Sequence, residues 1–311
     1  MDKLTPWIHA ARLRTLPLAI SGIITGAALA WFHAVFSWLI AALALLTALL
    51  LQILSNFAND YGDFVKGTDN DARVGPLRTL QSGALSPKQM KKAMVYLSIL
   101  SFISGACLLF VAGKANLDFP WAYFLLLGLG AIAAAVFYTV GKKAYGYYGM
   151  GDLMVFVFFG LASVMGAYYL FAAEFSLDSL ILAIGMGALS AGVLNLNNMR
   201  DIDNDTASGK RTLAASLGFK KAKIYHAFLV LIAIICVLMV AVISAFSLWS
   251  YLVMALPLLL LLKDVWLILN TENKAQLDPF LKKLSLATFA LSLSLLLAFG
   301  LQTMHHEALA L

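Results

Sequence analysis

Apolar runs of about 20 residues, separated by short polar segments, recur along this 311-residue chain. An α-helix of that length rises by 1.5 Å per residue, so it covers a hydrocarbon core of roughly 30 Å. The pattern therefore predicts an all-α polytopic membrane protein with nine transmembrane helices. The predicted spans are residues 16–31, 36–55, 94–112, 119–140, 153–172, 180–196, 225–246, 248–262 and 284–301.

The eighth predicted span differs from the others because polar residues interrupt it. Lys263 and Asp264 end its apolar run, and Pro257 is expected to kink it by removing a backbone hydrogen bond. We therefore expect residues 265–269 to continue as an interfacial turn.

Lysine and arginine residues predict the orientation, because they are retained on the cytoplasmic side of short loops. With the N-terminus inside, 21 of the 22 basic residues fall in cytoplasmic segments, and only Lys114 falls outside. The odd number of spans then places the C-terminus outside. We expect a multi-pass protein of the cytoplasmic (inner) membrane whose first apolar stretch is a retained span, since no small-residue cleavage site follows it. Residues 4–14 are expected to form an interfacial helix before that span.

Composition excludes a water-soluble fold. Hydrophobic residues make up 62% of the chain and charged residues 12%, whereas soluble domains have roughly 45–50% and about 25%. The formal charge of +6 comes from basic residues scattered over the loops at the membrane edge. We therefore expect contact with the lipid bilayer and with anionic substrates, and no nucleic acid. Cys107 and Cys236 lie in apolar spans and are interpreted as packing residues.

Acidic residues gather in two of the predicted cytoplasmic segments. If the second predicted helix continues past residue 55, Asn56, Asp60 and Asp63 share one of its faces, because residues at i, i+4 and i+7 align. After the sixth span, Asn197, Asp201 and Asp205 follow at i, i+4 and i+8. Seven of the 16 acidic residues lie in these segments: Asp60, Asp63, Asp69, Asp71, Asp201, Asp203 and Asp205.

The two carboxylate faces suggest an internal repeat of four helices plus four, with a ninth appended, inside a single domain of residues 1–311. Such a repeat brings both faces to one central cavity. Carboxylates brought together repel one another unless a cation neutralises them, and oxygen ligands suit Mg²⁺, which binds substrate phosphates. We interpret Asp60, Asp63, Asp201 and Asp205 as catalytic Mg²⁺ ligands for a substrate that carries a diphosphate.

Basic side chains near these segments are candidates to bind diphosphate oxygens. They are Lys66, Arg78, Lys142, Arg200 and Lys210. Alternatively, acidic residues in these segments are solvated loop charges. For Asp69, Asp71 and Asp203 both interpretations stay open.

Residues 141–151, with the neighbouring Tyr138, form a glycine- and tyrosine-rich stretch before the fifth span. It is either a loop that covers the substrate or an interfacial aromatic belt, and the belt is favoured for most of its tyrosines. Asp152 closes the stretch and is interpreted as a helix N-cap.

The two aspartate segments resemble those of the UbiA superfamily of intramembrane aromatic prenyltransferases, and the resemblance covers essentially the whole chain. The strings NFANDYGDFVKGTD, GPLRTLQSG, YTVGKKAYGYYGMGD and NNMRDIDNDTASGKRTL are similar to those of its menaquinone branch. Where many relatives have an Asp four residues after the second Asp of the first motif, this chain has Gly67, followed by Asp69. Carried over by position, the motifs fall on Asn56, Asn59, Asp60, Asp63, Asn198, Asp201 and Asp205.

This resemblance implies transfer of an all-trans polyprenyl group from polyprenyl diphosphate to 1,4-dihydroxy-2-naphthoate, with loss of CO₂, giving demethylmenaquinol, the reduced form of demethylmenaquinone. It implies Mg²⁺-assisted ionisation of the allylic diphosphate, followed by attack of the naphthoate ring on the cation. As parts of the two repeated carboxylate faces, Asn56 and Asn197 are expected to orient ligands. Tyr138 is expected to stabilise the cation. Arg14 and Arg78 are candidates for binding the naphthoate carboxylate.

Two rival functions stay open. A related prenyltransferase acting on 4-hydroxybenzoate, haem or a chlorophyll precursor would use the same aspartates. A secondary transporter also has internal repeats, but its ionisable site would lie near the membrane midplane rather than at the cytoplasmic edge.

Overall fold

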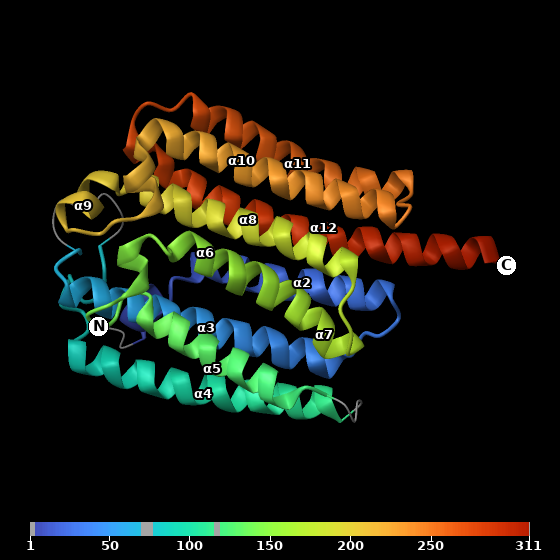
Figure 1. Cartoon of the computed structure of the whole chain (residues 1–311), viewed down its shortest axis with the longest axis horizontal. Coiled ribbons are helices and arrows are strands. Elements are labelled where there is room, and N and C mark those ends of the chain that lie inside the picture. Colours follow the sequence, from blue (N-terminus) through green and yellow to red (C-terminus); the bar gives the residue numbers. More distant parts are fainter. Residues whose placement is uncertain (1–3, 70–76, 115–118, 311) are drawn as a thin grey trace.

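The structure, a computed structural model, describes residues 4–69, 77–114 and 119–310, with side chains as far as residue 304 (Figure 1). Within these ranges every regular element is a helix. The α-helices are α1 (Thr5–Ala11), α2 (Leu16–Phe32), α3 (Trp38–Val65), α4 (Pro87–Gly113), α5 (Trp121–Phe137), α6 (Gly151–Val155), α7 (Gly166–Ala172), α8 (Leu177–Arg200), α9 (Ile202–Ala207), α10 (Leu213–Ile243), α11 (Leu248–Leu269) and α12 (Asp278–Ala310). Short 3₁₀ segments are η1 (Leu13–Thr15), η2 (Tyr145–Tyr148) and η4 (Lys274–Leu277), and η3 (Phe156–Met165) is a π-helix.

The long helices run side by side along one axis of the molecule (Figure 1). Eight helices of the described chain are long and apolar enough to cross a membrane, and α5 is a shorter apolar helix of 17 residues. Eight such helices and one shorter apolar helix are compatible with the nine predicted spans. We call the end of the bundle that carries α9 and the N-terminus the aspartate end; the C-terminus of α12 lies at the opposite end.

The main hydrophobic core lies between α2, α8, α10, α11 and α12. Leu182, Met186 and Leu189 of α8 are fully buried there against Val237 of α10 and Leu291 of α12. Alanine and glycine are common on these faces, which lets the helix backbones approach closely, as is typical of membrane bundles. Smaller clusters join α3, α4 and α5.

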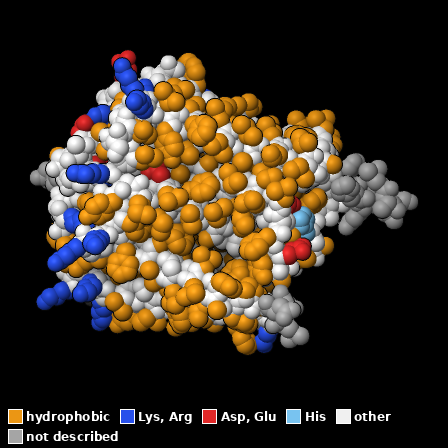
Figure 2. All heavy atoms as spheres, viewed as in Figure 1, with side chains coloured by type: hydrophobic (Ala, Val, Ile, Leu, Met, Phe, Trp, Pro, Cys, Tyr) orange, Lys and Arg blue, Asp and Glu red, His pale blue; other side chains and the backbone are white. Residues whose placement is uncertain are grey.

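The outside of the bundle is apolar. On α10, Phe228, Ile235 and Val242, seven residues apart, are 60%, 61% and 69% exposed. Hydrophobic side chains cover the visible face between the two ends, and Lys and Arg gather at the aspartate end (Figure 2). An exposed apolar surface of this extent fits contact with lipid.

The fifth predicted span is built from α6, η3 and α7, with ten residues of π-helix at its centre. Small residues bring η3 close to its neighbours on both sides. A Cβ atom on Gly22 of α2 would lie 2.0 Å from the Ser163 Oγ, and a Cβ on Gly160 would lie 2.5 Å from the Ala183 carbonyl oxygen of α8. A π-helix is rare and commonly marks a functional site, and here it forms one wall of the cavity described below.

The predicted interfacial turn and the predicted start of the seventh span need correction. The α11 helix runs without a break through Lys263 and Asp264 to Leu269, so the predicted interfacial turn is wrong. Lys263 is exposed and Asp264 is only half-buried, which explains why their charges do not end the helix. The α10 helix begins at Leu213, well before the predicted residue 225, with a kink at Gly218, whose φ is 73°.

Candidate active site

The first aspartate segment lies on α3, as predicted. The helix continues to Val65, and Asn56, Asp60 and Asp63 are all buried on it. The Asn56 side chain is fixed by donating to the Ala11 carbonyl oxygen at 2.8 Å and to Thr15 Oγ1 at 3.0 Å. The start of the chain is therefore anchored to this face of α3.

Two arginines surround the Asp60 carboxylate. Arg12 donates to it directly, the Arg78 Nη1 lies 3.4 Å from its Oδ1, and Thr79 Oγ1 donates to its Oδ2 at 3.0 Å. Arg12 reaches this position because its backbone is left-handed, with φ 50°, where the chain turns from α1 into η1. A helix forms in the predicted segment 4–14, but it ends at Ala11, and the turn that follows it brings Arg12 to the site.

The Asp63 carboxylate faces Tyr147 of η2. The Tyr147 hydroxyl donates to the Asp63 Oδ1 at 2.8 Å, and the Thr68 Oγ1 lies 2.6 Å from the same hydroxyl. The ammonium groups of Lys66 and Lys210 lie 3.7 Å and 5.6 Å from the centre of the Tyr147 ring. Three loops therefore meet at Asp63.

The second aspartate segment is not one continuous helix. The α8 helix ends at Arg200, Asp201 is its C-cap with φ −98° and ψ 11°, and Asp205 lies on the short helix α9. Backbone hydrogen bonds still join Asp201 to Asn197 and Asp205 to Asp201 at 3.2 Å and 2.8 Å, so the predicted i, i+4, i+8 order survives as a bent helix.

The Arg200 side chain is fully buried and is engaged within the protein. Its Nε and Nη2 donate to the two oxygens of Asp201 at 2.9 Å and 2.7 Å, its Nη2 also donates to Asn197 at 3.0 Å, and its Nη1 pairs with Asp278. These contacts tie the end of α8 to the start of α12. A role for Arg200 in binding diphosphate stays a prediction.

Lys210 lies among carboxylates of both segments. Its Nζ is 3.4 Å from the Asp205 Oδ1. Burial alone would lower the pKa of the Lys210 ammonium, but the nearby carboxylates of Asp63, Asp205 and Asp201 raise it above its ordinary value. Burial raises the pKa of Asp205 to about 6, with Asp201 and Asp63 adding to the rise and Lys210 opposing it. The two segments thus share one electrostatic environment.

A hydrogen bond also joins the segments, since the Asn204 side-chain amide donates to the Thr68 carbonyl oxygen at 3.0 Å. Asp203, in contrast, is exposed and pairs with Lys274 at 2.6 Å, which agrees with a solvated loop charge. Asp69 is buried, with an oxygen 3.8 Å from the Arg78 Nε. Asp71 lies outside the described residues.

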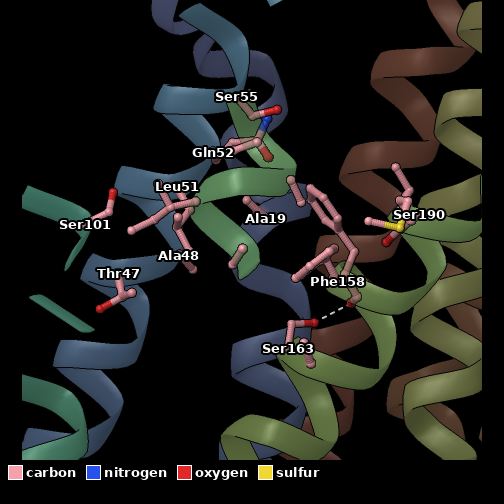
Figure 3. A pocket seen from close by; sticks show the side chains of 18 of the residues that line it. Ala19, Thr47, Ala48, Leu51, Gln52, Ser55, Ser101, Phe158, Ser163 and Ser190 are labelled. Carbon is pink, nitrogen blue, oxygen red and sulfur yellow. Dashed lines mark hydrogen bonds between the residues drawn. The ribbon is translucent and has the colours of Figure 1, made fainter. Parts of the chain in front are cut away.

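A cavity of about 420 Å³ extends from this site into the bundle. Its deeper wall is largely apolar, with Ala48 and Leu51 of α3 facing Phe158 of η3 (Figure 3). Eight of the predicted site residues line it: Arg14, Asn56, Asn59, Asp63, Arg78, Tyr138, Asn197 and Lys210. The other seven predicted site residues do not line it: Asp60, Lys66, Lys142, Asn198, Arg200, Asp201 and Asp205.

The aromatic-belt interpretation is wrong for most tyrosines of residues 138–148. Tyr138 and Tyr145 line the cavity, with ring centroids 5.3 Å apart, and Tyr147 is only 9% exposed. Among these tyrosines Tyr148 is the exposed one, at 63%.

Asp152 is not an N-cap, since the N-cap of α6 is Met150 and has no side-chain capping hydrogen bond. The Asp152 carboxylate is instead buried near Tyr225 of α10. Lys142 is exposed.

Sequence reasoning missed several residues of the site. Arg12 and Tyr147 contact the aspartates directly but lie far from them in sequence. Arg12 stands in a segment with helical apolar spacing, and Tyr147 in the tyrosine-rich string. Neither pattern by itself reveals a partner more than 45 residues away.

No three carboxylate, histidine or cysteine side chains of the described residues converge on one point closely enough to form a complete metal cage. The donor set nevertheless fits Mg²⁺. This ion usually keeps waters and is held by one or two carboxylates together with substrate phosphates. The Asp205 Oδ2 and the Asn198 Oδ1 are buried acceptors without a hydrogen-bond partner, and a cation or its waters would satisfy them.

The fold and the site together define a polytopic membrane protein with a carboxylate-rich site at the mouth of a largely apolar internal cavity. The family model described as "UbiA prenyltransferase family" matches residues 19–287. The chain belongs to the UbiA prenyltransferase family.

The expected resemblance to the menaquinone branch is confirmed by curated relatives. The chain is 45% identical over 305 residues to 1,4-dihydroxy-2-naphthoate octaprenyltransferase of Haemophilus influenzae, covering 96% of each chain. It is 45% identical over 279 residues to the protein of the same name from Escherichia coli, covering 89% of each. Among solved structures, a UbiA homologue from Archaeoglobus fulgidus bound to GPP and Mg²⁺ has the same fold, with a TM-score of 0.61 at 18% identity, covering 94% of this chain and 99% of that one.

Proposed function

We propose that this protein transfers an all-trans polyprenyl group from polyprenyl diphosphate to 1,4-dihydroxy-2-naphthoate. The carboxylate leaves as CO₂ and the product is demethylmenaquinol, a precursor of menaquinone. The names of the relatives from H. influenzae and E. coli support the choice of acceptor. The A. fulgidus homologue, whose structure contains GPP and Mg²⁺, supports a prenyl diphosphate donor and Mg²⁺.

The observation that carries the proposal is the meeting of both aspartate segments at the mouth of the cavity. Asp63 from α3 and Asp205 from α9 both raise the pKa of the Lys210 ammonium. The position between these carboxylates therefore favours a positive charge. The Asp60 carboxylate pairs with Arg12, and the Asp201 carboxylate pairs with Arg200. This arrangement suits a cation that binds between carboxylates on one side and phosphates on the other.

The residues that would hold Mg²⁺ are Asp60, Asp63, Asp201 and Asp205, with Asn198 as a further oxygen ligand. Bound there, Mg²⁺ supplies charge stabilisation to the leaving diphosphate. Lys210 and Arg78 line the same mouth and are suited to bind diphosphate oxygens with charge-assisted hydrogen bonds.

The cavity suits the rest of the reaction. The allylic carbon–oxygen bond breaks, diphosphate leaves, and the naphthoate ring forms the new carbon–carbon bond. Electrons of the bond to the carboxylate then return to the ring as CO₂ departs, so no added oxidant or base is needed. Apolar walls such as Leu51 and Phe158 keep water from the cation, and the Tyr138 ring lies where it can face the positive charge.

Arg14 is the proposed partner of the naphthoate carboxylate. It lines the cavity beside Thr15, near the start of α2, and a guanidinium matches a carboxylate with two parallel hydrogen bonds. Arg78 is the other candidate, but its contact with Asp60 suits it better to the diphosphate end.

The aspartate end is proposed to face the cytoplasm of the inner membrane. Lys and Arg side chains gather at this end (Figure 2), as the retention of basic residues inside would require. A single domain of residues 1–311 with a four-plus-four helix repeat stays part of the proposal.

The test is a radiolabelled prenyl-transfer assay on purified protein with either 1,4-dihydroxy-2-naphthoate or 4-hydroxybenzoate, in Mg²⁺ or in EDTA. We expect product only with dihydroxynaphthoate and only with Mg²⁺. Product with 4-hydroxybenzoate alone would mean that 4-hydroxybenzoate, and not dihydroxynaphthoate, is the acceptor. No product with either acceptor, from protein that is folded, would favour a transport function.

A further inference from the structure

Tyr147 connects three loops at the aspartate end without lining the cavity. Its hydroxyl contacts Asp63 at 2.8 Å and Thr68 at 2.6 Å. Its carbonyl oxygen accepts from the Arg211 backbone N–H at 3.0 Å. One buried residue therefore holds together the loop after α3, the loop before α6 and the loop after α9.

The direction of these hydrogen bonds follows from counting protons. The Asp63 carboxylate is an acceptor, so the single Tyr147 hydroxyl proton points to it. The Thr68 hydroxyl must then donate to the Tyr147 oxygen. This short chain from Thr68 through Tyr147 to Asp63 has one arrangement, which keeps the Asp63 carboxylate in one orientation.

The Tyr147 ring also orders two lysines. The Lys66 ammonium lies 3.7 Å from the ring centre and the Lys210 ammonium lies 5.6 Å from it, both within the range of cation–π attraction. Lys210 is in turn 3.4 Å from Asp205 of the second segment. The Tyr147 ring thus sets the distance between the Asp63 carboxylate of the first segment and the Lys210 ammonium, which pairs with Asp205 of the second segment.

We propose that Tyr147 is a positioning residue for the site that binds Mg²⁺ and diphosphate. Its hydroxyl holds Asp63 and its ring holds Lys210 in the places that the bound ion and diphosphate require. Tyr147 does not line the cavity, so it acts through Asp63 and Lys210. The inference rests on the proposed function for its choice of ligands.

The experiment measures binding of a radiolabelled polyprenyl diphosphate to full-length protein as a function of Mg²⁺ concentration, without acceptor. The Tyr147→Phe variant keeps the ring and removes the hydroxyl. A hydrogen bond to a charged group contributes about 1.5–3 kcal/mol, so we expect the half-saturating Mg²⁺ concentration to rise roughly tenfold or more. Thr68→Val should raise the half-saturating Mg²⁺ concentration by a smaller factor, because the Tyr147 hydroxyl still donates to Asp63.

Tyr148→Phe is the matched control, since it makes the same change at the adjacent, exposed tyrosine. We expect its Mg²⁺ curve to match that of the wild type. In turnover, Tyr147→Phe should leave the KM for dihydroxynaphthoate unchanged, and its thermal unfolding should stay close to that of the wild type.

The inference is overturned if Tyr147→Phe binds donor with the wild-type Mg²⁺ dependence. It is also overturned if the loss is matched by a fall in thermal stability or by an equal rise in the acceptor KM, since either result means a purely structural role. If wild-type protein itself shows no Mg²⁺-dependent donor binding, the proposed function fails, which is a different outcome.

Discussion

Replacing Arg200 by lysine separates its two possible roles. Lysine keeps the positive charge but loses the planar group that binds both oxygens of Asp201 while also reaching Asn197 and Asp278. If Arg200 braces α8 against α12, the variant loses stability and keeps its affinity for the donor. If Arg200 binds diphosphate, the donor affinity falls first.

The magnitude follows from the contacts. Lysine can retain one or two of the four interactions, and each hydrogen bond to a charged group contributes about 1.5–3 kcal/mol. Disrupting a buried ion pair costs about 3–5 kcal/mol in measured cases. Arg200→Lys should therefore destabilise the protein by roughly 3–5 kcal/mol, which corresponds to a fall in Tm on the order of 10 °C.

The assay is thermal unfolding of detergent-purified protein, with the donor KM measured well below the variant's Tm. Lys274→Met is the control, because it breaks the surface pair with the exposed Asp203, which contributes less than about 1 kcal/mol. A variant with wild-type Tm and a donor KM raised tenfold would refute the bracing role.

Three further changes have defined outcomes. Arg14→Met should raise the KM for dihydroxynaphthoate about tenfold or more while leaving the donor KM unchanged, because one charge-assisted contact is lost; an unchanged acceptor KM would move this role to Arg78. Lys210→Met should raise the donor KM about tenfold or more in the same assay, and wild-type kinetics would remove Lys210 from the site. Gly160→Val should lower the Tm, because its Cβ would lie 2.5 Å from the Ala183 carbonyl oxygen and overpacking costs about 1–3 kcal/mol; a Tm equal to that of the wild type would show that η3 can move away from α8.

Most of the fold could be predicted from the sequence, because each apolar run has the length of a span and the bilayer allows few alternatives to a helix. The continuation of α3 through Asp60 to Asp63 was also predictable, since the polar residues keep the helical spacing. The π-helix η3 was not, because its sequence is as uniformly apolar as that of the neighbouring helices. It depends on close packing at Gly22 and Gly160, which the sequence of one segment does not reveal.

The acidic residues of the site and three of their basic partners, Arg78, Arg200 and Lys210, were predicted, whereas other partners of the aspartates were missed. Carboxylates in an apolar chain stand out because they are costly near hydrocarbon. Arg12, Thr79 and Tyr147 look ordinary in sequence, because basic and aromatic residues are expected at any membrane edge. Their roles depend on tertiary contacts across three loops.

The central claim is that both aspartate segments serve one Mg²⁺–diphosphate site. The most direct measurement is prenyl transfer to dihydroxynaphthoate by Asp60→Asn and Asp201→Asn, one variant from each segment, after gel filtration has shown that each protein is folded. The account predicts that both variants lose turnover, at any Mg²⁺ concentration. Normal turnover in either variant would contradict a shared site.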